Sequence, residues 1–150
     1  YNRMAYEKLA LPLFQKCMGE SRSVGILFID ADHLKYINDN FGHDMGNLAI
    51  SNIASVIQRH CPLNAIAMRY GGDEFVCVIP GTDQQQLVLL EQQITDSLSG
   101  LSENNLFDFP IEASIGFVIA DNPELSLNDY INFADEKMYA VKKARRAARK

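Results

Sequence analysis

The chain has 150 residues, of which 47% are apolar and 22% are charged, so it is long enough for one domain with a hydrophobic core. No apolar run approaches the length of a membrane span, and the net charge of −5 argues against duplex nucleic acid as a partner. We therefore expect no nucleic-acid partner and no membrane contact by this segment.

The first part of the chain predicts helix, strand and helix. Residues 1–18 look helical, and residues 23–30 ("SVGILFID") form a continuous apolar run that ends in Asp, which is typical of a strand covered on both faces. A polar connector is expected over 31–46. A helix is then expected over roughly 47–60, where isoleucine and alanine side chains recur at helical spacing.

The second part predicts a hairpin, two helices and one more strand. "AIAMRY" and "FVCVIP" flank the turn Gly71–Glu74 as hairpin strands, and the next helix has Thr82 or Asp83 as its N-cap. Residues 111–120 alternate as a half-covered strand, and a last helix begins near Leu127. A strand hairpin mixed with helices predicts an α+β fold and not a doubly wound sheet.

The three cysteines, Cys17, Cys61 and Cys77, show no metal-ligand spacing. Their odd number suits free thiols that pack as small buried hydrophobes in a reducing compartment. This usage favours a cytoplasmic location, and it is compatible with a membrane anchor elsewhere in a longer parent protein.

Two pairs of carboxylates stand at the ends of predicted strands. Asp30 and Asp32 lie at the end of the first strand, and Asp73 and Glu74 lie in the hairpin turn. If the first strand pairs beside the hairpin, four carboxylates converge, and they cannot all stay ionised without a cation between them. A divalent ion such as Mg²⁺, held by carboxylates and by substrate phosphates, would explain the cluster and would suit nucleotidyl transfer.

The acidic pairs have two alternative interpretations. A solvated acidic turn, in which Gly71 and Gly72 supply the turn geometry and the carboxylates face water, remains open for the hairpin by itself. A calcium-binding loop beginning at Asp30 is excluded, because Lys35 stands where that loop needs Gly and Phe41 stands where it needs Glu.

Polar residues between the first strand and the following helix suit a nucleotide. Backbone N–H groups near residues 32–35 offer a site for phosphate, and Asn38 has both a donor and an acceptor for a base edge. A histidine such as His43, taken by itself, is more often a capping or loop residue than a ligand. The basic stretch 142–150 ("KKARRAARK") is either a solvated helix end or a second anion site.

Three motifs occur in a fixed order: "DADHLKYINDNFGHDMGN" (30–47), "RYGGDEF" (69–75) and "ADEKMYAVKKARR" (134–146), after an opening "YNR". Together they resemble the GGDEF domain, the diguanylate cyclase family, which makes cyclic di-GMP from two GTP molecules. The resemblance spans essentially the whole chain. It implies a single GGDEF domain over residues 1–150, excised from a longer signalling protein, with a central, mostly antiparallel sheet wrapped by helices, similar to the palm of polymerases and nucleotidyl cyclases.

The resemblance also implies residue roles. Mg²⁺ or Mn²⁺ would be bound by the Asp30 and Asp73 carboxylates and by the Ala31 carbonyl. Asp73 would take the proton from the attacking 3′-hydroxyl, and Glu74 would assist with metal or proton. Asn38 would contact guanine, and His43 and Asn47 would complete the nucleotide pocket. Lys142 and Arg146 would bind the triphosphate, and Lys35 is a further substrate-binding residue.

Three departures from the family pattern bear on function. Asn47 replaces an Asp, which should weaken the grip on guanine or loosen base choice, because a neutral hydrogen bond is about half as strong as a charge-assisted one. The family's inhibitory product site, R-x-x-D, reads "PLNA" at residues 62–65, so no inhibitory product site is expected. Arg145 replaces the usual Gly, and the chain ends soon afterwards.

The resemblance implies that catalysis needs a second GGDEF domain, so that each GTP meets the other across a homodimer, and that an upstream sensory or receiver domain brings the pair together. The alternatives are a degenerate domain that binds GTP or a partner without turnover, a cyclase with relaxed base specificity, and a single-substrate nucleotidyl cyclase on the same palm-like fold.

Overall fold

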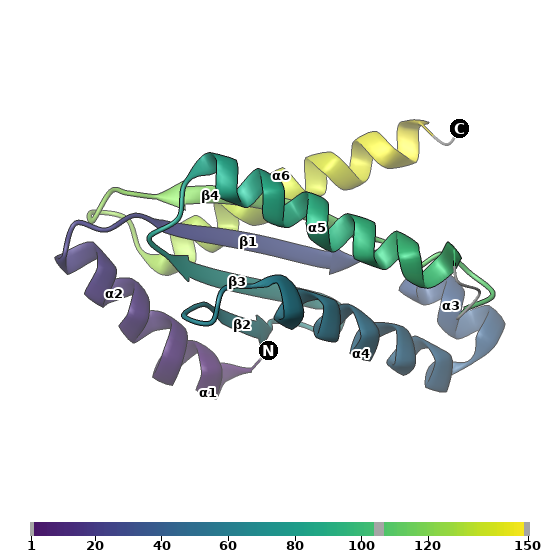
Figure 1. Ribbon diagram of the computed structural model, residues 1–150. Coiled ribbons are helices and arrows are strands. Elements are labelled where there is room, and N and C mark those ends of the chain that lie inside the picture. Colours follow the sequence, from purple (N-terminus) through teal and green to yellow (C-terminus); the bar gives the residue numbers. More distant parts are fainter. Residues whose placement is uncertain (1, 104–106, 149–150) are drawn as a thin grey trace.

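The computed structural model describes residues 2–103 and 107–148. Its centre is an antiparallel sheet of four strands in the order β2-β3-β1-β4 (Figure 1). The strands are β1 (Val24–Ala31), β2 (Ile66–Arg69), β3 (Glu74–Pro80) and β4 (Ala113–Ala120). β2 and β3 form the predicted hairpin, and β1 lies beside β3, as the metal hypothesis required.

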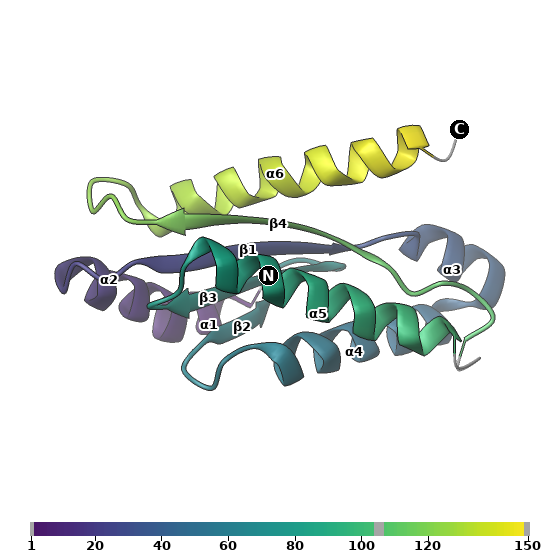
Figure 2. The same cartoon turned by 45° about the horizontal axis from the view of Figure 1, so that its top comes forward.

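Helices cover both faces of this sheet, which confirms the predicted α+β class. Figure 2 shows α6 on one face and α4 and α5 on the other. The helical elements are α1 (Arg3–Ala5), the π-helical stretch η1 (Tyr6–Ala10), α2 (Leu11–Gly19), α3 (Leu34–Phe41), α4 (His43–His60), α5 (Gln84–Glu103) and α6 (Leu127–Ala148). None of the helices in these described ranges combines the length and apolar character that a bilayer crossing requires.

The strands divide the apolar side chains between two cores. In β1, Leu27 and Ile29 pack with residues of α4 and α5, whereas Ile26 and Phe28 pack with residues of α2 and α6. Alternate side chains of a strand point to opposite faces, so a strand with helices on both sides reads as a continuous apolar run. Asp30 follows the even-numbered residues and therefore lies on the α6 face.

β4 is an edge strand, and both of its faces are covered. Residues 111–115 on its odd-numbered face belong to the α4/α5 core, while α6 packs on the other face. The backbone of α6 comes so close that a Cβ at Gly116 would overlap the Ala134 carbonyl oxygen and the Met138 nitrogen. The prediction of a half-covered strand was therefore wrong, because Gly116 lets a whole helix rest where a larger side chain would hold it off.

The predicted polar connector over residues 31–46 was also wrong in part. It contains α3, and α4 begins at His43, four residues earlier than predicted. Gly42 separates the two helices with φ of 92°, a left-handed region that glycine occupies at little cost. At the next helix, Asp83 accepts the Gln86 N–H at 2.8 Å and is the N-cap of α5, one of the two predicted candidates.

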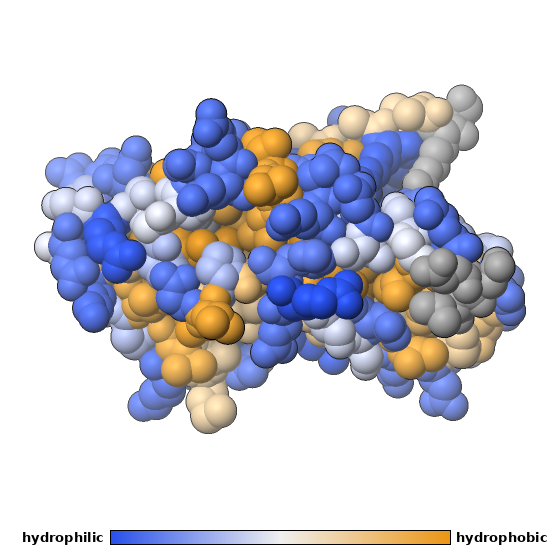
Figure 3. Space-filling view, viewed as in Figure 1, coloured by the Kyte–Doolittle hydropathy of each residue, from blue (hydrophilic) through white to orange (hydrophobic). Residues whose placement is uncertain are grey.

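The surface shows no single large apolar face in the view of Figure 3. Polar side chains dominate there, and apolar ones gather in small separate patches. The exposed apolar residues include Leu48 on α4 and Val88 and Leu89 on α5. Isolated apolar residues of this kind are normal on globular proteins.

Candidate functional site

A row of polar residues crosses the sheet on its α6 face. Asp30 at the end of β1 is paired with Glu74 of β3 on one side and with Ser114 of β4 on the other. Residues that are directly opposite on antiparallel strands have their side chains within contact distance. The sequence prediction that the end of the first strand meets the acidic hairpin is therefore confirmed.

Backbone hydrogen bonds hold the hairpin turn against β1. Ala31 donates its N–H to the Asp73 carbonyl at 2.9 Å, which extends the β1–β3 ladder into the turn. The Arg69 guanidinium donates to the Gly72 carbonyl across the turn, and its Nε lies 3.1 Å from that oxygen. Asp73 is consequently held next to Asp30 by the backbone and does not depend on a flexible loop. The alternative of a hairpin turn standing alone in water does not fit this packing.

Lys142 of α6 places its ammonium group between two carboxylates. Its Nζ donates to Asp30 Oδ2 at 2.9 Å and lies 3.8 Å from Asp32 Oδ1. The side chains of Lys142 and Asp30 are 17% and 14% exposed, so the pair is largely withdrawn from water. Lys142, which was expected to bind phosphate, thus forms an ion pair with Asp30 and lies near Asp32.

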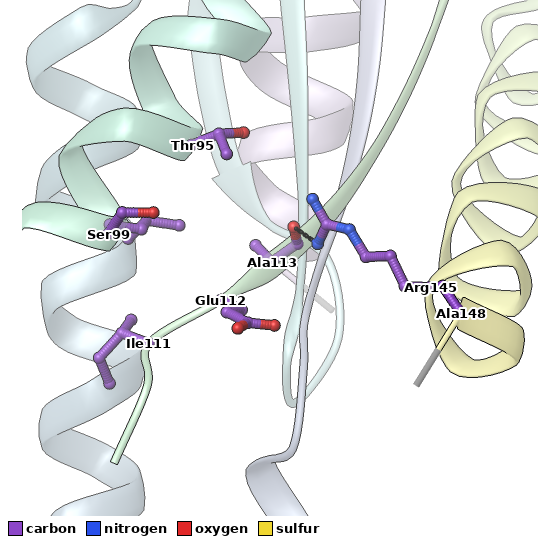
Figure 4. Close-up of a pocket in the computed structure, with 8 residues that line it drawn as sticks. Thr95, Ser99, Ile111, Glu112, Ala113, Arg145 and Ala148 are labelled. Carbon is purple, nitrogen blue, oxygen red and sulfur yellow. Dashed lines mark hydrogen bonds between the residues drawn. The ribbon is translucent and has the colours of Figure 1, made fainter. Parts of the chain in front are cut away.

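Asp32 is buried, at 6% exposed, and three groups surround it. Ser114 Oγ donates to it at 2.9 Å, Arg145 Nη1 donates to its Oδ2 at 3.1 Å, and Lys142 lies farther away. The same Arg145 nitrogen donates to the Ala113 carbonyl at 2.7 Å, as Figure 4 shows. Arg145 thereby ties the end of α6 to the first residue of β4.

Sequence reasoning missed Arg145 and Ser114 as parts of this cluster. Arg145 was noted only because it replaces a glycine of the family motif, and Ser114 carried no signal of its own within the predicted strand 111–120. Arg145 also lines a pocket of about 300 Å³ between α5 and the end of α6, with Thr95, Ser99 and Glu112 (Figure 4).

The electrostatics of Asp30 are unusual. Its pKa is raised to about 6, mainly by burial and also by the neighbouring Asp73 carboxylate, while the Lys142 ammonium opposes both effects. The pKa of Glu74 is also raised, mainly by burial and then by Asp73. Asp30 Oδ1 is a buried oxygen without a hydrogen-bond partner. An acidic oxygen that is buried and unpaired beside another carboxylate fits a cation ligand.

Asp30 and Asp73 could therefore hold a divalent cation through their carboxylates, with the Ala31 carbonyl beside them. Within residues 2–103 and 107–148, no three His, Cys, Asp or Glu side chains form a ready-made cage for a metal. A full cage is not what Mg²⁺ requires, since it is usually bound by one or two carboxylates with water and substrate phosphates filling the remaining positions.

Four of the six predicted nucleotide-binding residues lie on α3 and α4, on either side of the junction at Gly42. The Asn38 side chain lies against Gly46, where an added Cβ would overlap its Oδ1. His43 and Asn47 are exposed on the first and second turns of α4, and Lys35 is exposed on the first turn of α3. These residues are thus gathered on neighbouring turns of two helices.

The N-terminus of α3 provides the predicted donors for an anion, with one correction. Leu34, Lys35 and Tyr36 precede the first hydrogen bond of the helix, from Ile37 N–H to the His33 carbonyl, so their N–H groups have no helical acceptor. Asp32 N–H, in contrast, donates to the Glu112 carbonyl at 2.9 Å and is excluded from the site. His33 adopts φ of 63°, a rare conformation for a non-glycine residue, as the chain turns from β1 into α3.

Arg146 and residues 62–65 lie outside the group of contacting carboxylates and cations described above. Arg146 is exposed near the end of α6, in contrast to Lys142 one turn earlier. Residues 62–65 form a turn between α4 and β2, closed by a hydrogen bond from Ala65 N–H to the Pro62 carbonyl at 3.0 Å.

The family model for the diguanylate cyclase GGDEF domain matches residues 1–148. Among curated proteins, the chain is 32% identical over 147 residues to the probable diguanylate cyclase DgcC of Escherichia coli K12. The aligned region covers 97% of this chain and 39% of DgcC. The chain therefore spans well under half the length of that relative.

Among solved structures, the GGDEF domain of DgcB from Caulobacter crescentus, in complex with c-di-GMP, superposes with a TM-score of 0.86 at 27% identity and covers 95% of this chain and 85% of that one. A second DgcB structure, which holds the coiled coil as well as the GGDEF domain, gives a TM-score of 0.85 at 26% identity, with 95% and 76% covered. Sequence motifs, sheet topology and both comparisons agree: the chain belongs to the diguanylate cyclase GGDEF domain family.

Proposed function

We propose that this domain condenses two GTP molecules into cyclic di-GMP. The observation that carries the proposal is the meeting of Asp30 with the Asp73–Glu74 turn, which leaves a buried, unpaired oxygen on Asp30. Family membership supports the same reaction, and the matched relative DgcC is described as a probable diguanylate cyclase.

Asp30, Asp73 and the Ala31 carbonyl are the groups that would hold Mg²⁺ or Mn²⁺. When bound, the ion supplies charge neutralisation for the triphosphate and acidifies the attacking hydroxyl. The hard oxygen donors of these residues suit either ion. The raised pKa of Asp30 supports the assignment, since a carboxylate that resists ionisation without a cation gains most when a cation arrives.

The remaining charged residues act on the substrate. Asp73, beside the site, takes the proton of the 3′-hydroxyl, and Glu74 assists it. Lys142, whose Nζ lies 2.9 Å from Asp30 Oδ2, would turn to the triphosphate if a bound ion neutralised that carboxylate. Arg146, one helical turn further along the same face of α6, adds a second cation for the phosphates.

The base is bound at the α3–α4 junction. Asn38 reads the guanine edge, with His43 and Asn47 on the adjacent turn and Lys35 near the phosphates. Asn47 can offer guanine only one carbonyl acceptor where the family's Asp offers a charged carboxylate, so we propose that guanine is held less tightly than in that pattern.

One domain binds one GTP, so the reaction needs a second GGDEF domain that faces the first. We propose that the chain is one domain of a longer cytoplasmic signalling protein, whose upstream sensory or receiver part brings two copies together. The greater length of DgcC and the coiled coil that accompanies the DgcB domain support this arrangement.

Turnover is tested by incubating the domain with GTP and Mg²⁺ at high protein concentration and identifying products by mass spectrometry. We expect the linear intermediate and cyclic di-GMP, and we expect both to disappear in Asp73→Asn. Asp121→Asn is the matched control, since Asp121 is an exposed carboxylate just after the far end of β4. GTP that binds normally but gives no product in the wild type would replace this proposal with a binding domain, and a cyclic mononucleotide would indicate the single-substrate cyclase.

Base specificity is tested separately with Asn47→Asp. We expect the variant to bind GTP more tightly and to discriminate more strongly against ATP. Equal affinities and equal products in both proteins would show that residue 47 does not contact the base.

A further inference from the structure

Two of the three cysteines lie next to each other although they come from different elements. Cys61 follows the last residue of α4, and Cys77 lies in the middle of β3. Their sulfur atoms are 3.7 Å apart, within the distance of a thiol hydrogen bond. Cys17, in contrast, belongs to the core on the opposite face of the sheet.

The two thiols differ in access. Cys77 is fully buried, whereas Cys61 is half-buried and lines a pocket of about 230 Å³ with Gln58, Leu63 and Ala67 among its other walls. A small molecule in that pocket meets Cys61 first. The hydrogen bond with Cys77 also lowers the pKa of the Cys61 thiol, which increases the fraction present as the nucleophilic thiolate.

We propose that Cys61 and Cys77 form an oxidisable pair that closes to a disulfide on exposure to a hydroperoxide. The Cys61 thiolate attacks the peroxide, breaks the O–O bond and becomes a sulfenic acid, while the released oxygen leaves as water or alcohol. The Cys77 sulfur then attacks the Cys61 sulfur, and the hydroxyl leaves as water with the Cys77 proton. The protein loses two hydrogen atoms, and the peroxide is reduced by two electrons.

Closure requires the sulfur atoms to move from 3.7 Å to about 2.0 Å. Cys77 is fixed, because β3 is paired at this residue with Leu27 of β1 and with Ala67 of β2. Cys61 is the partner that we expect to move, because it follows the last residue of α4 with an extended backbone and leads into the turn 62–65. The disulfide therefore fastens the C-terminal end of α4 to β3.

This link joins the two elements that carry opposite sides of the proposed nucleotide site. α4 begins with His43 and Asn47, and β3 begins with Glu74. The inference does not depend on the proposed activity, since it rests only on the two sulfur atoms and on the pocket beside Cys61.

The test treats the reduced chain with hydrogen peroxide and measures intact mass, followed by digestion with trypsin without reduction. Cleavage after Arg59 and Arg69 puts the two cysteines in different peptides. We expect a loss of two hydrogen atoms, one cross-linked pair of peptides containing Cys61 and Cys77, full reversal by dithiothreitol, and a free Cys17. Oxidation of Cys61 to sulfinic acid while Cys77 stays free, the absence of any oxidation, or links only between separate chains would overturn the proposal.

Two variants separate the roles of the sulfurs. Cys61→Ser should lose the cross-link and leave Cys77 unreacted, and Cys77→Ala should accumulate a sulfenic acid at Cys61 that dimedone traps. Cys17→Ala is the control and should form the cross-link as the wild type does. If Cys77→Ala fails to fold, the peptide map of the wild type still decides the matter.

Discussion

Lys142 Nζ lies 2.9 Å from Asp30 Oδ2, and both side chains are largely buried. A lysine and an aspartate from elements 112 residues apart in sequence thus neutralise each other at the position where a metal and a triphosphate are proposed to bind. Because the Lys142 ammonium already neutralises Asp30, we expect substrate binding to exchange partners at this carboxylate and not simply to add charge.

Lys142→Met should weaken GTP binding in the presence of Mg²⁺ by roughly ten- to a hundredfold, the equivalent of about 1.5–3 kcal/mol for a hydrogen bond to a charged group. The methionine keeps most of the side-chain volume and loses the ammonium group. Calorimetric titration with a non-hydrolysable GTP analogue measures the change. Lys143→Met, on the exposed neighbouring residue, is the control and should stay within about threefold of the wild type. Equal losses in both variants would mean that Lys142 contributes only general positive charge.

The stability of the metal-free protein should depend on the ionisation of Asp30. Its pKa is about 6 in the folded protein against an ordinary 3.8, so the fold binds the proton more tightly than the unfolded chain does. The wild type should therefore be most stable relative to Asp30→Asn below about pH 4 and should lose that advantage as the pH rises through 6, by at most about 3 kcal/mol.

Urea denaturation of both proteins in a chelator, at intervals between pH 4 and 7, measures this difference. Added Mg²⁺ should restore the stability of the wild type at pH 7 and leave Asp30→Asn unchanged, because the cation favours the ionised carboxylate. A difference between the two proteins that stays constant over this pH range would show that Asp30 ionises as freely in the fold as in water.

The local elements and the meeting of the first strand with the hairpin could be predicted from the sequence, and the contacts of α6 with the sheet could not. The apolar run of β1, the glycine-rich turn and the stripe of α5 are signals contained within a few residues, and each corresponds to an element of the structure. α3 was missed because residues 31–46 were interpreted as one polar connector, although Leu34, Ile37 and Phe41 recur at helical spacing within it.

The candidate site shows the same division. The convergence of Asp30 with Glu74 followed from strand pairing, which a hairpin and a neighbouring strand predict. The contact between Asp32 and Arg145 joins residues 113 positions apart, and it exists because Gly116 lets α6 lie close on β4. Neither the sequence spacing nor the motif indicates that approach.

Alanine substitution of the adjacent residues Arg145 and Arg146 should affect different properties, stability for Arg145 and GTP binding for Arg146. Arg145→Ala removes the bonds to Asp32 and to the Ala113 carbonyl and leaves a buried carboxylate with fewer partners, so it should lower the free energy of unfolding by about 1–3 kcal/mol. Arg146→Ala, on an exposed residue, should change it by less than about 0.5 kcal/mol and should weaken GTP binding instead. Denaturation curves and calorimetry on the same two variants measure both effects. A stable Arg145→Ala would show that Ser114 and Lys142 suffice to hold Asp32.

Gly46→Ala should reduce nucleotide binding with little loss of helix stability. A methyl group at residue 46 would overlap the Asn38 Oδ1, so the Asn38 amide must rotate away from the position in which we propose it meets the base. Gly100→Ala is the matched control, since Gly100 also lies within a helix and has open space around its missing Cβ. That variant should bind GTP as the wild type does and should be more stable by up to about 1 kcal/mol, the difference between Gly and Ala in a helix interior. If Gly46→Ala binds GTP normally while Asn38→Ala does not, the Asn38 side chain has another route to the base. If both bind normally, the base is held elsewhere.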